Sequence, residues 1–507
     1  MNSRPDASIY AGPSAADWLV RFAAAVVIYL LVAGAFSPGY IALSTPLHSD
    51  LFRYFEISQQ PFDSKLWASP RPLMLAMLRV LDTGDFGLFH IMLLAVSVLL
   101  PVFMLAVLEC ALRTRIGKGG VIAFLALCYV LPSFYELAPL DFGGALSGIV
   151  ACIAVMVLAK KNGWTSVIAY ALLTWVSLEF KPSYAFVLCL VPIFIKWGAS
   201  KKEMFPASAA AFLVSVAVFM KDRWLGSSFV GVGAASGGSY ELLGKPAIMF
   251  DAGMFYAQRL FSLATWLLIV ACAVYVARRM GWRPVVALAA LALMAIVPLL
   301  LIPNHRFVMY AWYPASVLLL LVPLAASQVP QGRWRAAWLW GLAMGVLLSC
   351  WSESRFLTMH RSWYVHNQQL NANVIESLRQ VQAQVVPGER VLISGRLGPY
   401  VPYKNDAFIG RFMPQGAAWT VVTPPSEDVL IAMSPNTKRY VPMSALDGAE
   451  FDKHIEYDQA GRIDRISRPD PAIGPPGDTP LKRTLLFCSP AGAADAAVQA
   501  ACLGTVR

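Results

Sequence analysis

One stretch of the chain, Ser44-Thr-Pro-Leu-His-Ser-Asp-Leu-Phe-Arg-Tyr-Phe-Glu56, follows the first long apolar segment and precedes the motif Ser69-Pro-Arg-Pro-Leu73. It places one acid, Asp50, beside His48. Apolar residues at spacings of three and four follow in two sets: Leu51, Tyr54 and Phe55, then Leu73, Met74, Met77, Leu78 and Leu81. Each set covers one face of a helix, and such helices lie in the interface of a bilayer. We therefore expect the chain to leave the membrane here and to return along two interfacial helices.

The composition indicates an integral membrane protein. Of the 507 residues, 57% are hydrophobic and only 14% are charged, which is too little charge to cover a water-soluble protein of this length. The net charge of +11 does not indicate nucleic-acid binding, because the Lys and Arg residues stand in short segments between apolar runs. We therefore expect an all-α polytopic membrane domain, with membrane lipid and no nucleic acid among its partners.

Apolar segments that can cross a hydrocarbon core of about 30 Å recur along the chain. We expect about eleven spans, at 18–36, 86–110, 121–132, 143–159, 165–179, 184–197, 205–220, 260–277, 284–302, 307–326 and 335–352. Basic residues occur in every second loop, as at Arg113, Lys160, Lys201, Arg278 and Arg333. Cytoplasmic loops carry this excess. The amino terminus is therefore expected in the cytoplasm, and the alternate loops on the exported side of a bacterial inner membrane.

The composition changes near residue 352. Residues 1–352 form the predicted membrane domain, with 37–85 as the first exported loop, and the run 18–36 is long enough to remain as an anchor. Residues 353–507 have the length of one further domain, expected on the exported side. A polar helical pattern over 353–384 and strand patterns at 390–394 and 429–433 predict a small α/β fold.

The cysteines do not form a metal-binding motif, since no CxxC or Cys/His cluster is present. Six of them fall in or beside apolar segments, where they serve as small core residues: Cys110, Cys128, Cys152, Cys189, Cys272 and Cys350. Cys488 and Cys502 lie in the polar C-terminal region. In an oxidising compartment they can form a disulfide, and two unpaired thiols are the alternative.

Acids of the exported loops are the first candidates for chemistry. Asp50 lies between apolar runs, where a shielded carboxylate can act as a general base or hold Mg²⁺ or Mn²⁺. His48 can orient Asp50 or bond to the backbone. Glu136 and Asp141 flank Pro139 and precede two glycines, an arrangement that can bind a sugar or a cation. Simple solvation explains all three loop acids as well.

Basic and aromatic residues of the exported loops are candidates for binding a phosphate. In Pro303-Asn-His-Arg-Phe-Val-Met-Tyr-Ala-Trp-Tyr-Pro314, His305 and Arg306 stand at the mouth of a span. Arg binds phosphate through two parallel hydrogen bonds, although Arg306 can instead extend toward lipid headgroups. Lys181 and Arg71 are further candidates. Tyr313 can stack on a sugar ring or belong to an aromatic belt at the membrane surface.

These features together resemble the GT-C superfamily of integral-membrane glycosyltransferases. The resemblance is carried by His48-Ser-Asp50 in the first exported loop, by Arg71-Pro72, by His305-Arg306-Phe307 with Tyr313-Pro314, and by the topology. It implies transfer of a hexosyl or pentosyl group from a polyprenyl-phosphate-linked donor to a glycan, lipid or protein acceptor. The sequence contains no P-loop, GxSxG, HExxH or dinucleotide-binding motif. This argues against ATP-driven, serine-hydrolase, zinc-protease and oxidoreductase functions.

The resemblance also implies roles for the candidate residues. Asp50 would be the general base of an inverting reaction. The donor phosphate would be bound by four residues: Arg306, His305, Lys181 and Arg71. The acceptor or the sugar would contact four others: His48, Glu136, Asp141 and Tyr313.

One feature departs from the GT-C pattern. Many members pair two adjacent acids in the first exported loop, but here Leu51 follows Asp50, so a second carboxylate would come from Glu136 or Asp141. Members that use a lipid monophosphate donor commonly work without a metal. We therefore expect no cofactor, with Mg²⁺ or Mn²⁺ as the alternative.

Other functions fit parts of this pattern. A secondary transporter or flippase of lipid-linked saccharides would have ionisable residues near mid-membrane and broken helices, whereas the acids here gather on one side. A polysaccharide polymerase or ligase would carry its large exported loop between late spans. A non-catalytic assembly protein built around the C-terminal region is a further alternative.

Overall fold

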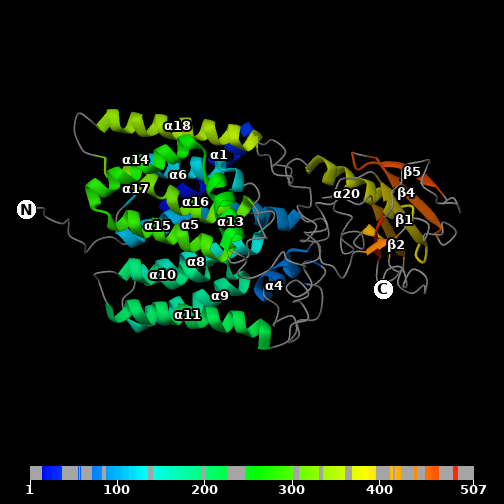
Figure 1. The fold of residues 1–507 in the computed structure, drawn as a ribbon, viewed down its shortest axis with the longest axis horizontal. Helices are drawn as coiled ribbons and strands as arrows, with labels where there is room; N and C mark the ends of the chain where they lie inside the picture. Colours follow the sequence, from blue (N-terminus) through cyan, green and yellow to red (C-terminus); the bar gives the residue numbers. More distant parts are fainter. Residues whose placement is uncertain are drawn as a thin grey trace, which may run out of the picture. The chain divides into compact units, whose positions relative to one another are not determined.

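A computed structural model gives the fold of the chain (Figure 1). It describes residues 14–36, 55, 58, 71–82, 87–113, 115–134, 141–160, 163–196, 201–224, 246–300, 308–329, 335–359, 368–395, 412–414, 417–423, 439–441, 451–458, 460–467 and 484–488. The chain divides into two compact units. The first contains the helices α1 to α18, and the second contains α20 and a six-stranded sheet.

The first unit is helical throughout its described residues. Its α-helices are α1 (Ala15–Phe36), α4 (Pro72–Leu81), α5 (Gly87–Leu112), α6 (Lys118–Val130), α8 (Phe142–Lys160), α9 (Trp164–Phe180), α10 (Ala185–Lys196), α11 (Lys201–Trp224), α13 (Pro246–Leu260), α14 (Leu263–Met280), α15 (Arg283–Leu300), α16 (Trp312–Leu319), α17 (Leu321–Ser327) and α18 (Arg335–Met359). Two short 3-10 helices, η2 (Pro182–Tyr184) and η4 (Val308–Ala311), precede α10 and α16.

Among the described residues, seven helical segments are long and apolar enough to cross a membrane. They are Ala15–Val32, Gly87–Leu112, Phe142–Lys160, Lys202–Lys221, Leu263–Met280, Arg283–Leu300 and Met309–Ser327. Each of the predicted spans coincides with one of these, with a shorter apolar helix, or with α18. The predicted helical membrane architecture is confirmed, and the number of spans stays a prediction.

The outer faces of the long helices are apolar, as contact with lipid requires. On α14 the exposed residues Leu263, Leu267, Val270 and Val274 follow at spacings of four, three and four, which places them along one face. A contiguous apolar face of this kind is not tolerated in water unless another surface covers it.

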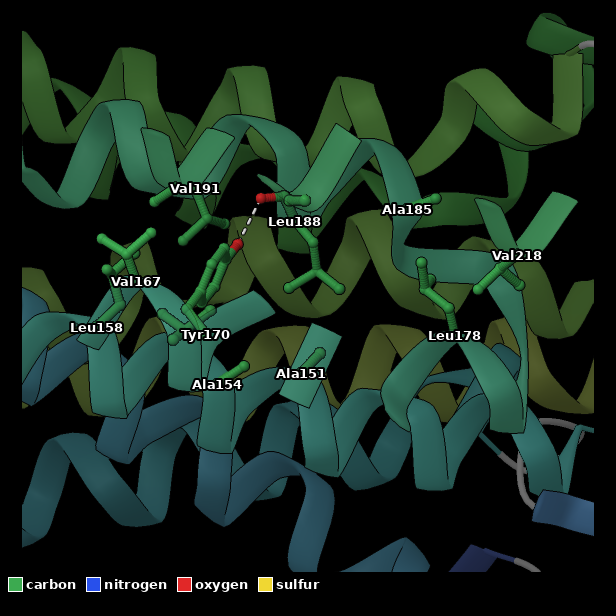
Figure 2. Close-up of a cluster of buried hydrophobic side chains, with 13 residues drawn as sticks. Ala151, Ala154, Leu158, Val167, Tyr170, Leu178, Ala185, Leu188, Val191 and Val218 are labelled. Atoms are coloured by element: carbon green, nitrogen blue, oxygen red, sulfur yellow. Dashed lines mark hydrogen bonds between the residues drawn. The ribbon is translucent and has the colours of Figure 1, made fainter. Parts of the chain in front are cut away.

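Helices α8, α9 and α10 pack through small and branched side chains (Figure 2). Ala151 and Ala154 of α8 are buried, and their small size lets α9 approach closely. Pro192 lies inside α10 and has no N–H, so the carbonyl of Leu188, four residues earlier, loses its helical donor. Tyr170 of α9 replaces that bond, because its hydroxyl donates to the Leu188 carbonyl (Figure 2).

Two helices outside the spans test the predictions for the loops. The helix predicted after Arg71 is present as α4, which buries Met74, Leu75, Leu78 and Leu81, while its place at the membrane interface stays a prediction. The predicted spans leave 221–259 as a loop, but α13 begins at Pro246. Hydropathy does not reveal α13, because its buried face is one narrow stripe at spacings of four, Ala252, Tyr256 and Leu260, among exposed and half-buried residues.

The second unit is a mixed α/β fold. Its strands are β1 (Arg390–Gly395), β2 (Ala418–Thr423), β3 (Arg439–Val441), β4 (Lys453–Tyr457), β5 (Ile463–Ser467) and β6 (Thr484–Cys488), in the order β3-β6-β2-β1-β4-β5. β1 pairs in parallel with β2 and β4, and the remaining pairs are antiparallel. The predicted strand at 390–394 is present as β1, whereas the predicted strand at 429–433 lies outside the described residues.

Helix α20 (Gln368–Gln382) carries the apolar stripe that this unit buries. Val374, Leu378 and Val381 are buried, and Ser377 donates from its hydroxyl to the carbonyl of Gly461 in the turn between β4 and β5. The polar helical pattern predicted over 353–384 therefore corresponds to two helices, the end of α18 and α20. The disulfide predicted between Cys488 and Cys502 stays a prediction, because position 502 lies outside the described residues.

Candidate functional site

The described part of the chain contains four of the predicted site residues: Arg71, Asp141, Lys181 and Tyr313. The others lie outside it, namely His48, Asp50, Glu136, His305 and Arg306. The geometry below therefore concerns the first four and the residues around them.

Asp141 and Lys181 form a buried ion pair where α8 begins and α9 ends. The ammonium Nζ of Lys181 lies 2.5 Å from Oδ1 of Asp141. Asp141 is only 2% exposed and Lys181 only 8%, so the simple solvation considered for Asp141 is excluded. Oδ1 also accepts the backbone N–H of Gly144 at 3.1 Å, which caps the first turn of α8. Such bonds are what make a buried charge tolerable.

Two tyrosines complete the surroundings of this pair. The hydroxyl of Tyr313 donates to Oδ2 of Asp141 at 2.6 Å, across 172 residues of sequence. Nζ of Lys181 lies 4.9 Å from the ring centroid of Tyr310, a cation–π geometry. Tyr310 and Tyr313 are both buried, so they do not form part of an exposed aromatic belt. Both oxygens of Asp141 are thus occupied, while Asp141 uses one of the three N–H groups of Lys181.

The two glycines after Asp141 are required by close approach. A Cβ on Gly144 would overlap the Tyr313 hydroxyl and the Asp141 carboxylate. A Cβ on Gly143 would lie 2.7 Å from Sδ of Met74 on α4 and 3.0 Å from the carbonyl oxygen of Phe180 on α9. These glycines therefore let α4, α9 and Tyr313 meet at the start of α8.

Two α-helices begin at the site, α4 directly after Arg71 and α8 directly after Asp141. Helix N-termini carry partial positive charge and unsatisfied N–H groups, so they favour anions. The charge of Arg71 adds to that of Lys181. Together these features make the site suited to a bound anion.

Lys181 lies in the link between α9 and η2, outside both helices. Burial lowers the pKa of its ammonium to about 8, and the positive charge of Arg71 acts in the same direction, while Asp141 opposes the shift. An additional negative charge at this position would be stabilised by the lysine and would in turn keep the lysine protonated.

An apolar cavity of about 520 Å³ has Tyr313 in its wall. Its lining also includes Gly148 and Tyr184, and Met280 and Trp282 at the turn between α14 and α15. Its walls come from α5, α8, α10, α15, α16 and α17. Tyr313 thus faces both the polar pair and the apolar cavity. A ligand with an anionic head and a hydrocarbon tail fits this combination.

Among the described residues, no group of three or more His, Cys, Asp or Glu side chains is placed to hold a metal ion. Asp141 is also a poor metal ligand here, because Lys181, Gly144 and Tyr313 already donate to its oxygens.

Comparisons with known proteins come from the fold alone, since no protein family model and no curated protein matches the sequence. The arabinofuranosyltransferase AftD from mycobacteria matches 77% of this chain at 15% identity, with a TM-score of 0.42. This chain spans about a third of AftD, since the match covers 30% of the AftD chain. ArnT from Cupriavidus metallidurans, bound to undecaprenyl phosphate, matches 94% of this chain and 98% of its own, at 13% identity and a TM-score of 0.46.

Two other ion pairs, one buried and one partly buried, were not predicted from the sequence. Glu179 accepts a hydrogen bond from the indole of Trp175 at 2.8 Å and pairs with Lys221 of α11. Arg21 of α1 binds both oxygens of Glu109 on α5, at 2.6 and 2.8 Å. A charged residue inside a predicted span was the available signal, because such a residue needs a partner.

Proposed function

We propose that this chain is a membrane glycosyltransferase that uses a polyprenyl-phosphate-linked sugar. Lys181 and Arg71 bind the donor phosphate, and the prenyl chain enters the apolar cavity behind Tyr313. The observation that carries the proposal is the position of Tyr313, which donates to Asp141 of the buried Asp141–Lys181 pair and also lines the apolar cavity. A water-soluble nucleotide-sugar donor would have no use for the cavity.

Asp141 does not serve as the base in this proposal. Its carboxylate already accepts from Lys181, Gly144 and Tyr313, and it is almost fully buried. Its role is to hold the ammonium of Lys181 toward the phosphate and to fix Tyr313 at the boundary between head and tail. This differs from the sugar or acceptor contact suggested by the sequence.

The reaction has a simple balance. The acceptor hydroxyl gives its proton to the general base, for which Asp50 is our candidate, and its oxygen forms a bond to the anomeric carbon. The bond from that carbon to the phosphate oxygen breaks on the opposite face, which inverts the configuration. Lys181 and Arg71, with Arg306 and His305 as further candidates, neutralise the charge that develops on the leaving phosphate. These cations make a divalent metal unnecessary for charge neutralisation.

The proposal also includes the orientation of the chain in the membrane. If the loops rich in Lys and Arg face the cytoplasm, the site lies on the exported side of the membrane. The acceptor is then a glycan, lipid or protein of the cell envelope.

The test is binding of undecaprenyl phosphate to the purified full-length chain in detergent, measured by thermophoresis. Replacing Lys181→Gln removes the charge but leaves a side chain that can still donate to Asp141. We expect binding to weaken about thirtyfold or more, because a buried charge contact is lost. Arg71→Ala should weaken binding less. The matched control, Lys202→Ala, changes an exposed lysine of α11 and should leave binding unchanged.

Wild-type affinity in Lys181→Gln would show that the phosphate is not bound here. A second readout is transfer of sugar in membranes supplied with lipid-linked donors, where Asp50→Asn should abolish turnover with little effect on binding of undecaprenyl phosphate.

A flippase is the second candidate, favoured by the break between α16 and α17 at Leu320, where a 3-10 bond from Leu320 N–H to the Val317 carbonyl replaces the helical one. The cavity argues against it. Its described lining contains a single charged side chain, Arg283, so a phosphosugar head would cross without partners. A reconstituted vesicle assay for movement of lipid-linked sugar separates the two functions.

A further inference from the structure

The backbone of Lys181 is held by two buried serines that no proposed chemistry uses. Ser147 lies on α8 and Ser177 on α9, and both are fully buried. The hydroxyl of Ser147 donates to the carbonyl of Lys181 at 2.9 Å. The two hydroxyl oxygens lie 2.9 Å apart, and the Ser177 hydroxyl also lies 2.9 Å from the carbonyl oxygen of Ser147.

The local sequence explains why Lys181 needs this support. Lys181 precedes Pro182, which forces it out of the helical conformation, and its backbone is extended with φ −168° and ψ 135°. Helix α9 therefore ends, and Lys181 becomes the N-cap of η2. Ser147 donates a hydrogen bond to the Lys181 carbonyl from the neighbouring helix, and the Lys181 N–H bonds to the carbonyl of Ser177 at 3.3 Å. Both backbone groups of Lys181 are thereby fixed.

The same two helices meet again through the side chain of Lys181. Ser147 stands on α8, whose first turn is capped by Asp141, and Ser177 stands on the last turn of α9. One connection between the helices therefore runs from the serines to the Lys181 backbone, and the other from Asp141 to the Lys181 ammonium. A long, flexible lysine would otherwise turn its ammonium toward water.

We propose that Ser147 and Ser177 are positioning residues that hold Lys181 for the phosphate of the lipid-linked substrate. This inference rests on the proposed function. The serines touch neither substrate nor reacting atoms, and they act only through the placement of the lysine. Their hydroxyl pair sets the register of α8 against α9, so the ammonium stays between Asp141 and Tyr310.

The experiment is a double-mutant cycle with binding of undecaprenyl phosphate as the readout. Ser147→Ala should weaken binding about tenfold, the effect of losing one buried hydrogen bond that orders the lysine. In the Lys181→Gln background the same change should have no further effect, because the group that it positions is gone. Ser147→Thr keeps the hydroxyl and should restore binding.

The matched control is Ser166→Ala on α9, the helix that carries Ser177. Ser166 is also fully buried, but its hydroxyl bonds to the carbonyl of Gly163 at the other end of α9. It should lower the thermal midpoint about as much as Ser147→Ala while leaving binding unchanged. Ser177→Ala should resemble Ser147→Ala.

Two results would overturn the inference while leaving the proposed function intact. One is unchanged binding in Ser147→Ala when Lys181→Gln binds weakly. The other is an equal loss from Ser147→Ala with and without the lysine, which would make the serines purely structural. If Lys181→Gln itself binds as the wild type does, the phosphate site is wrong, and the positioning role fails with it.

Discussion

Two buried ion pairs at opposite ends of the helical unit show how a structural pair differs from a candidate site. Cys110, next to Glu109, packs with Met156 near the end of α8, whereas Asp141 stands at the start of that helix. At the first end, the fork of Arg21 meets both oxygens of Glu109, and Glu109 also accepts the N–H of Ile116 at 2.7 Å. At the second end, Lys181 makes a single contact with Asp141.

The difference lies in what surrounds each cation. The guanidinium of Arg21 is matched by a carboxylate with the complementary planar shape, and the pair closes the turn between α5 and α6. The ammonium of Lys181 has Arg71 near it, an aromatic ring beside it, and a cavity next to its tyrosine neighbour. The first pair should therefore support stability, and the second should support binding.

The largest effect should come from breaking the structural pair. Glu109→Ala leaves the Arg21 charge buried without its carboxylate and should destabilise the protein by about 3–5 kcal/mol. Thermal unfolding in detergent measures this loss. Replacing both residues by leucine removes both charges and should recover most of the stability. A small loss in the single variant would contradict the structural role.

A smaller effect, confined to the site, should follow Gly144→Ala. The new methyl group would overlap Tyr313 and Asp141, and relieving such an overlap costs about 1–3 kcal/mol. Binding of undecaprenyl phosphate should fall along with stability, because Asp141, which holds the Lys181 ammonium, and Tyr313, which lines the cavity, both move. Gly119→Ala on α6 is the control, since nothing lies within 4 Å of its added methyl. If the two variants bound undecaprenyl phosphate with equal affinity, Tyr313 would not be part of the phosphate site.

The affinity for undecaprenyl phosphate should depend on pH, because the proposed phosphate site contains Lys181. Burial lowers the pKa of Lys181 to about 8, so its positive charge is present below that pH and is lost as the pH rises through it. Affinity for undecaprenyl phosphate should fall above about pH 8, with the decline delayed in the complex because the phosphate favours the charged lysine. Lys181→Arg should flatten the profile, since guanidinium keeps its charge. A flat wild-type profile up to pH 10 would contradict the role of Lys181.

The smallest effect belongs to an exposed pair near the structural one. Arg115 and Asp17 are in contact, but the Arg115 side chain is 65% exposed. Arg115→Ala should leave the thermal midpoint unchanged within error, because water screens an exposed ion pair. If Arg115→Ala lowered the thermal midpoint as much as Glu109→Ala does, the whole turn between α5 and α6 would contribute to stability.

Much of the helical unit could be predicted from the sequence, because the hydropathy of a segment depends only on residues that are close together in the chain. Each predicted span coincides with a helix, and α4 was predicted from apolar spacing after Pro72. Asp141, Lys181 and Tyr313 were each singled out from their positions near the ends of spans. Their mutual contact was not predictable, because it depends on how α8, α9 and α16 pack. The same limit explains why α13, the strands after β1 and the partners of Glu109 and Glu179 were missed.

The order of residues alone determined that this chain is helical, apolar and divided near its last long helix, because those properties follow from the solvent preference of each segment. Only the tertiary structure decided that Asp141 is occupied by three donors and that Tyr313, one of those donors, also lines an apolar cavity. The physical reason is distance along the chain. Tyr313 and Asp141 are 172 residues apart, and only the packing of their helices brings a hydroxyl and a carboxylate within hydrogen-bonding reach.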